Sequence, residues 1–123
     1  MKRMLGFAIL ASVAAFIALG AQNTGASDPL KDPHFVWREG ERLVALRLKD
    51  PDSARFTGWV SDTGESLVAC GEVSAHNSFG GYAEPVRWRL NAKEGVAYLD
   101  TGAAGFASAW REECTAPPVL NKG

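Results

Sequence analysis

Residues 70–82, with the sequence CGEVSAHNSFGGY, bring a carboxylate, an imidazole and a hydroxyl close together in the chain. These are the groups that general acid–base and nucleophilic hydrolysis use. A small periplasmic hydrolase using His76 with Glu72 or Ser78 is therefore one hypothesis. A catalytic triad depends on geometry rather than on nearness in sequence, and the chain contains neither a GxSxG elbow nor an HExxH helix. We predict no catalytic residue, and catalysis stays the alternative.

The same stretch also has the composition of a binding loop. Residues 74–84 join two expected strands, and they exceed the roughly two to five residues that a hairpin loop needs. One interpretation is a self-packed loop, with flexible glycines and with Phe79 and Tyr82 folded back onto the sheet. The other is a recognition loop, because Asn, Ser, Gly and aromatic residues bind other surfaces at little entropic cost. The residues predicted to bind a partner are Asn77, Ser78, Phe79, Gly80, Gly81 and Tyr82.

Hydrophobic periodicity predicts the elements that must position this loop. Apolar residues at helical spacing predict helices over 35–49 and 106–114, although Gly40 argues that the first helix begins only at Glu41. A short helical turn with Asp50 as its N-cap follows the first helix, and strands of alternating polarity come next. The turn is expected over 51–55, and the strands are expected over 56–61, 67–73, 85–90 and 96–100.

Together these elements predict an α+β domain with one covered sheet face. Its parts are an N-terminal helix, a short helical turn, an antiparallel meander of about four strands, and a C-terminal helix packed on one sheet face. Two cysteines in an exported chain favour a disulfide, and a bond from Cys70 to Cys114 would tie the C-terminal helix to the second strand. Two free thiols are the alternative. Neither a metal site nor a cofactor is predicted, because two distant cysteines make a poor ligand set.

Polarity within the expected elements predicts which side chains form the core. In the strand 85–90, Trp88 alternates with Arg87 and Arg89. This pattern is typical of a half-buried antiparallel strand whose polar residues face water. The tryptophans expected on core faces are Trp37, Trp88 and Trp110.

The N-terminus has the plan of a secretory signal peptide. Lys2 and Arg3 precede an uncharged, apolar run, and small residues at a cleavage site follow it. An uncleaved anchor helix is the alternative, although the run falls short of the roughly 20 residues that span a bilayer. Cleavage would leave no stable membrane span and would place the protein in the periplasm or outside the cell. The expected organisation is a signal peptide over 1–20, a flexible tether over 21–32, a single α+β domain over 33–118 and a tail over 119–123.

Three short motifs resemble those of a known group of proteins. LKDPDSARF at 48–56, CGEV at 70–73 and NSFGGY at 77–82 resemble motifs of small exported bacterial proteins that have no assigned activity, cofactor or catalytic residue. The resemblance implies a discrete domain and implies no chemistry. In that group Asn and Lys are common around the positions of Ser74 and His76, so this departure weakens a catalytic role for His76.

The charge pattern limits the choice of partner. The chain has 13 basic and 14 acidic residues, for a net charge of −1, and no segment forms the basic stripe that nucleic-acid binding requires. We therefore expect an exported cell-envelope protein that binds an envelope protein or ligand without chemistry, through residues 77–82. A purely structural envelope protein is a further alternative.

Overall fold

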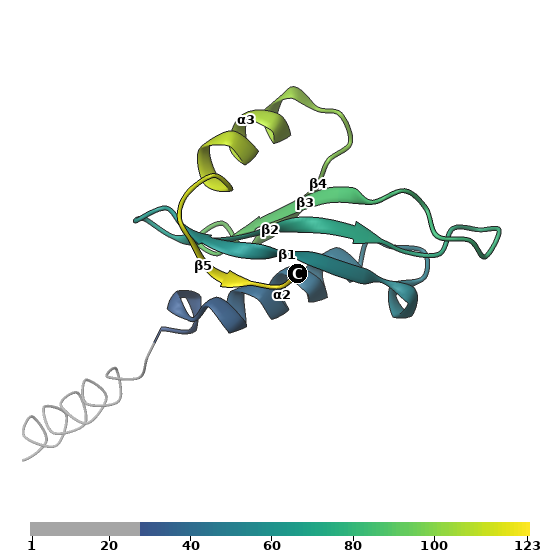
Figure 1. Cartoon of the computed structure of the whole chain (residues 1–123), viewed down its shortest axis with the longest axis horizontal. Coiled ribbons are helices and arrows are strands. Elements are labelled where there is room, and N and C mark those ends of the chain that lie inside the picture. Colours follow the sequence, from purple (N-terminus) through teal and green to yellow (C-terminus); the bar gives the residue numbers. More distant parts are fainter. Residues whose placement is uncertain (1–27) are drawn as a thin grey trace, which may run out of the picture.

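The computed structural model describes residues 28–123, and the expected signal peptide and most of the expected tether lie outside this part of the chain. Along residues 28–123, two α-helices and five strands follow one another, with short 3-10 turns before α2 and before β1 (Figure 1). The predicted α+β class is confirmed. The elements are η2 (Pro29–Lys31), α2 (Pro33–Ala45), η3 (Pro51–Ser53), β1 (Arg55–Asp62), β2 (Leu67–Ser74), β3 (Val86–Asn91), β4 (Val96–Leu99), α3 (Ala104–Glu113) and β5 (Pro118–Asn121).

All five strands form one antiparallel sheet in the order β4-β3-β2-β1-β5. The first four strands are the predicted meander, and β5 adds a fifth strand where we expected the chain to end in a tail. The Asp62 N–H donates to the Pro117 carbonyl at 2.9 Å, and the Lys122 N–H donates to the Gly58 carbonyl at 2.8 Å. β5 has only four residues and begins at a proline, so its pairing with β1 leaves no periodic pattern in the sequence.

The helix α2 begins earlier than its composition predicts. Asp32 caps it by accepting a hydrogen bond from the His34 N–H, and a proline occupies the first turn. Residues 28–32, which we expected in a flexible tether, thus form η2 and this cap. The expected start at Glu41 is wrong, because Gly40 lies buried inside α2 and serves packing. A Cβ atom at Gly40 would lie 2.5 Å from Cζ3 of Trp88, so the missing side chain lets α2 lie close to the sheet.

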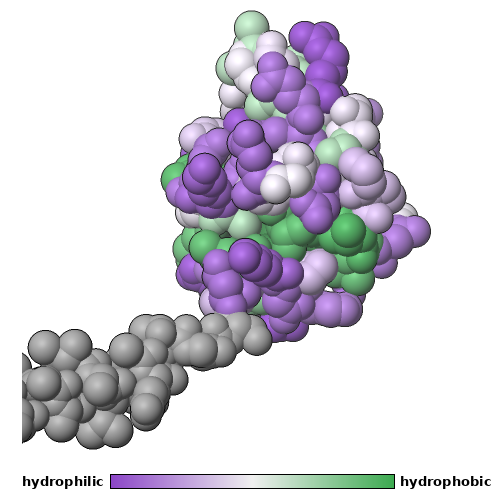
Figure 2. Space-filling model, turned by 90° about the vertical axis from the view of Figure 1, so that its left-hand side faces the viewer, coloured by the Kyte–Doolittle hydropathy of each residue, from purple (hydrophilic) through white to green (hydrophobic). Residues whose placement is uncertain are grey.

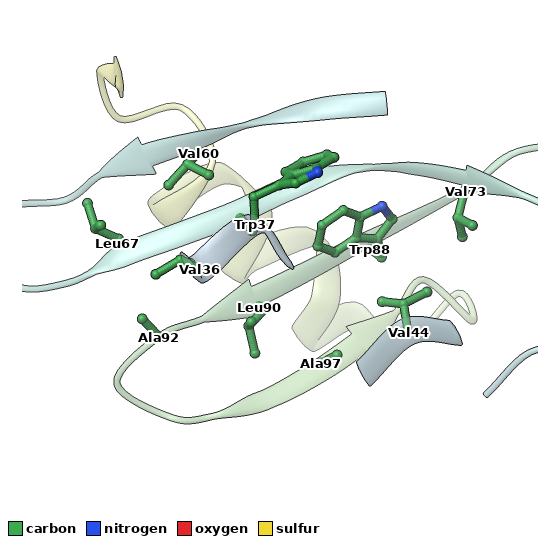
Figure 3. Close-up of a cluster of buried hydrophobic side chains, with 11 residues drawn as sticks. Val36, Trp37, Val44, Val60, Leu67, Val73, Trp88, Leu90, Ala92 and Ala97 are labelled. Atoms are coloured by element: carbon green, nitrogen blue, oxygen red, sulfur yellow. The ribbon is translucent and has the colours of Figure 1, made fainter. Parts of the chain in front are cut away.

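The main core lies between α2 and one face of the sheet (Figure 3). Trp88 is fully buried at its centre, with ring centroids 5.2 Å from Trp37 and 5.9 Å from Phe56. Each large apolar side chain buried in this way contributes about 1.5–3 kcal/mol relative to exposure. The other buried members of the cluster are Val36, Val44, Val60, Leu67, Ala69, Val73, Leu90, Ala92 and Ala97.

The opposite face of the sheet carries α3, so the prediction of one covered face is wrong (Figure 1). The predicted disulfide between Cys70 and Cys114 is present, and it ties the end of α3 to β2. Trp110 is half-buried there rather than central to the main core, with its ring 5.7 Å from that of Trp59. Alternation along β2 explains both layers, because neighbouring residues of a strand face opposite sides. Within residues 28–123, no helix is long and apolar enough to cross a bilayer.

Two arginines of β3, Arg87 and Arg89, also contact side chains of α3. The Arg89 side chain is almost fully buried, and its Nη1 donates to Glu113 Oε2 at 3.0 Å. The guanidinium also lies 4.6 Å from the ring centre of Tyr98. The prediction that Arg89 faces water is wrong, because α3 covers this side of β3 and supplies the carboxylate that pairs with the buried charge.

Candidate functional site

Residues 74–84 extend the β2–β3 hairpin rather than forming an open loop. The Ala83 N–H donates to the Ala75 carbonyl at 3.0 Å, and His76 pairs with Tyr82 as an isolated bridge. The Ser74 hydroxyl donates to the Ala83 carbonyl at 2.6 Å. In Figure 1 this ribbon projects beyond the sheet and past the C-terminal end of α2. The length that appeared excessive for a turn is therefore a two-stranded projection, which we name the 74–84 hairpin.

The tip of the 74–84 hairpin is a tight turn that explains two of the predicted binding residues. The Gly80 N–H donates to the Asn77 carbonyl at 3.1 Å, and the Asn77 N–H donates to the Gly81 carbonyl at 2.8 Å. The Asn77 side chain also accepts from the Phe79 N–H at 2.9 Å. Gly80 has a φ of 84°, the left-handed conformation that this three-residue hairpin turn requires. Asn77 and Gly80 are thus accounted for by turn formation alone.

The two aromatic residues of the 74–84 hairpin have different surroundings. Tyr82 packs against the hairpin base, with its ring centre 4.2 Å from that of His76 and 3.7 Å from the Arg55 guanidinium carbon. Phe79 is 97% exposed at the tip. The expectation that both rings fold back onto the sheet is therefore wrong for Phe79. A fully solvated phenylalanine contributes little to packing within the fold.

The segment after α2 makes hydrogen bonds to the 74–84 hairpin. Ser53 Oγ accepts a hydrogen bond from the His76 N–H at 2.8 Å. Lys49 Nζ donates to Ser78 Oγ at 3.0 Å. Asp50 makes no cap hydrogen bond to η3, and its carboxylate instead lies 3.4 Å from His76 Nδ1. The two conspicuous motifs, at 48–56 and 77–82, therefore contact each other in the fold.

An open groove of about 390 Å³ lies between the segment after α2 and the 74–84 hairpin. Leu48, Val73, Val86 and Leu99 form its apolar floor, and Phe79 stands at its edge. We name it the hairpin groove. Its remaining lining residues are Arg47, Lys49, Ala75, His76, Asn77, Ser78, Ala83 and Glu84.

The geometry does not assemble the residues of the hydrolase hypothesis. His76 Nδ1 lies beside Asp50, and Ser78 Oγ is held by Lys49. Glu72 is exposed in β2, where it pairs across the sheet with Thr57 and Arg87. Within residues 28–123, no hydrogen bond or ion pair joins His76 to Glu72 or to Ser78, and no group of three potential metal ligands occurs.

A second apolar surface lies at the end of the molecule where the described chain begins (Figure 2). Figure 2 shows hydrophobic residues gathered there in a band. Leu30 and Phe35 line a small cavity of about 120 Å³. A neighbouring hollow of about 350 Å³ carries more carboxylates than ammonium groups. Its charged lining residues are Asp28, Lys31, Asp62, Glu65 and Lys93.

Perturbed titration occurs away from the hairpin, at the base of α3. The Gly102 N–H and, next, the Arg87 guanidinium hold the pKa of Asp100 below its ordinary value. Arg87 donates to Asp100 Oδ2 at 2.8 Å and lies 5.0 Å from the ring centre of Trp110. This cluster positions α3, and sequence reasoning missed it because its members come from three separate elements.

Comparisons with protein-family models, with curated proteins and with solved structures gave no match. The resemblance of the motifs to small exported bacterial proteins therefore stays a prediction. What is known of the site is its geometry: a braced hairpin, an exposed aromatic tip and an apolar groove with a polar rim.

Proposed function

We propose that this protein is a non-catalytic binding module of the cell envelope and that residues 77–82 contact its partner. The observation that carries the proposal is the 97% exposure of Phe79 at the tip of a hairpin that Lys49 and Ser53 contact at Ser78 and His76. Single exposed apolar residues are common on protein surfaces. This one stands next to an apolar groove, which makes it part of a continuous contact surface.

These hydrogen bonds also favour binding, because an ordered hairpin loses little conformational freedom when a partner contacts it. The side chains of Lys49 and Ser53 hold the hairpin from outside, and Asn77 holds its turn from within. Rigidity in the free state lowers the entropic cost of association. These hydrogen bonds hold the backbone that carries Phe79, and aromatic side chains are frequent anchors in interfaces.

The proposed location rests on two features. Disulfides persist in oxidising compartments and are rare in the cytosol, and Cys70 and Cys114 are bonded. The N-terminal sequence has the charged, apolar and small-residue regions of a signal peptide. We place the protein in the periplasm or outside the cell, with an uncleaved anchor as the alternative.

In-cell photo-crosslinking tests this function directly. A photoreactive phenylalanine analogue replaces Phe79 in one strain and replaces Val119, an exposed residue of β5, in a control strain. A specific crosslinked species is expected from position 79 and not from position 119. The partner is then purified, and its affinity is measured for the wild type and for Phe79→Ser.

Phe79→Ser should lower that affinity by about tenfold to a hundredfold, because burial of a phenylalanine side chain is worth about 1.5–3 kcal/mol. The melting temperature should stay unchanged, since Phe79 contacts no core residue. Equal crosslinking at both positions, or an unchanged affinity, would show that the hairpin tip is not the contact. A purely structural role predicts that no specific species forms at position 79.

A further inference from the structure

The floor of the hairpin groove is an uncovered continuation of the main core. Val73 belongs to the core cluster that α2 covers, and Leu48 and Leu99 pack against that cluster. α2 ends at Ala45, whereas the sheet face continues onto the 74–84 hairpin beyond the helix (Figure 1). Part of this face therefore remains open to solvent, and Val86 is 36% exposed there. An apolar segment bound in the groove would cover the part of this sheet face that α2 does not reach.

In the part of the chain that the structure describes, two basic side chains at the rim of the groove make no ion pair, although the Asp50 carboxylate lies 3.4 Å from Nδ1 of the neighbouring His76. Arg47 Nη1 donates to the Ala97 carbonyl at 2.8 Å, and Lys49 Nζ donates to the Ser78 hydroxyl at 3.0 Å. Both acceptors are neutral, and within residues 28–123 neither side chain makes an ion pair. Glu84 is the one carboxylate among the residues that line the groove. The groove is thus locally cationic in a chain whose net charge is −1, and the hollow at the opposite end of the molecule has the reverse balance.

We propose that the hairpin groove binds an extended segment of a partner protein in which apolar side chains alternate with acidic ones. This inference rests on the proposed function and names the chemistry of the partner. Successive side chains of an extended chain point to opposite sides. The apolar side chains then cover the partly exposed floor residues Leu48, Val86 and Leu99, while the carboxylates face the rim where Arg47 and Lys49 lie.

The openness of the groove favours a protein segment over a small amphiphile. Sites for small ligands bury most of the ligand surface, whereas several lining residues of this groove, Phe79 and Glu84 among them, are exposed. An extended chain can use such a groove because it also contacts the exposed Phe79 ring beside it. Charge complementarity between rim and segment supplies specificity and speeds association.

Fluorescence anisotropy with short labelled peptides tests the inference on the chain that lacks the signal segment. One peptide alternates leucine with aspartate, a second alternates leucine with lysine, and a third alternates serine with aspartate. The leucine–aspartate peptide should bind most tightly, and its affinity should fall as salt is raised. Backbone amide shifts should map its site to Leu48, Val86 and Leu99.

Charge variants test the role of the rim. Lys49→Glu should weaken the leucine–aspartate peptide by about fivefold to tenfold, since it replaces an exposed attraction by a repulsion. Lys49→Gln should weaken it less. Lys122→Glu makes the same charge change at an exposed site in the C-terminal segment that does not line the groove, and should have a smaller effect. A melting temperature for each variant separates loss of binding from loss of fold.

Several outcomes overturn the inference. One is equal binding of the leucine–lysine peptide; another is equal effects of Lys49→Glu and Lys122→Glu. A third is the absence of leucine–aspartate binding up to millimolar concentration. A fourth is that decanoate binds in the groove without displacing the leucine–aspartate peptide, which would place the peptide elsewhere. If position 79 still crosslinks to a specific partner in these cases, the proposed function stands and the acidic-segment inference alone fails.

Discussion

The substitution Gly40→Ala separates helix propensity from packing in this fold. Gly40 lies inside α2, where alanine is preferred over glycine by about 1 kcal/mol. The structure predicts the opposite sign. A Cβ at this position would lie 2.5 Å from Cζ3 and 2.8 Å from Cη2 of Trp88, well inside ordinary van der Waals contact.

The size of the effect follows from how firmly Trp88 is held. Its side chain is fully buried and packs against Trp37 and Phe56, so the ring cannot turn away cheaply. Overpacking of a dense core costs about 1–3 kcal/mol, and a closest contact of 2.5 Å places Gly40→Ala near the top of that range. After the gain in helix propensity, we expect a net loss of about 2 kcal/mol in the free energy of unfolding. For a domain of this size, that corresponds to a melting temperature lower by about 8–16 °C.

Thermal and urea unfolding of Gly40→Ala and Gly105→Ala test this reasoning as a matched pair. Gly105 also lies in a helix, α3, and a Cβ there would meet nothing within 4 Å. Gly105→Ala should therefore stabilise the protein by up to about 1 kcal/mol. Trp88→Phe removes the outer ring atoms that would clash, so Gly40→Ala should cost much less in that background, and a double-mutant cycle measures the coupling. Stabilisation by both alanines, or additive effects in the cycle, would refute the packing argument.

Two further predictions concern α3 and its attachment. Replacement of Cys70 and Cys114 by alanine opens a loop of 44 positions and should lower the free energy of unfolding by about 4 kcal/mol. Denaturant titration with and without reductant would measure this loss, and a loss under about 1 kcal/mol would contradict the loop-entropy argument. The Gly102 N–H and the Arg87 guanidinium lower the pKa of Asp100 in the folded protein. The Asp100 carboxylate therefore stabilises the fold fully above its unfolded pKa of about 3.9, and this stabilisation is lost as the pH falls through its folded pKa. Asp100→Asn should therefore melt below the wild type at neutral pH and approach it as the pH falls through the folded pKa of Asp100, and a gap that persists in acid would contradict this assignment.

The second strand shows how much a local pattern determined in advance. Strict alternation along β2 separates Val73 from Cys70, and the structure places them in the two different packing clusters. The turns between strands were likewise predictable, because they depend on residue types within a few positions. The disulfide was predictable because the chain has only two cysteines to pair. Even there, the sequence alone did not show that helices cover both faces of the sheet.

The candidate site was predictable only in outline. The sequence predicted a long loop with flexible glycines between the second and third strands, and the structure shows a tight turn over 77–81 within it. The exposure of Phe79 was not predictable, because an aromatic residue in a loop packs inward or outward according to what lies beside it. The groove also exists because α2 ends before it reaches the 74–84 hairpin in space. The residue types of the two segments do not reveal how far each extends in the fold.

By itself, the sequence determined the order and kind of most elements, the pairing of Cys70 with Cys114, and the place to look for a contact. Those features arise from interactions between residues close in the chain or from a choice among very few partners. Tertiary structure alone decided that Gly40 makes room for Trp88 and that Arg89 is buried. It also decided that residues 49–53 brace a hairpin more than twenty positions away. These are contacts between distant segments, and their energies depend on distance in space, which no local pattern of residue types encodes.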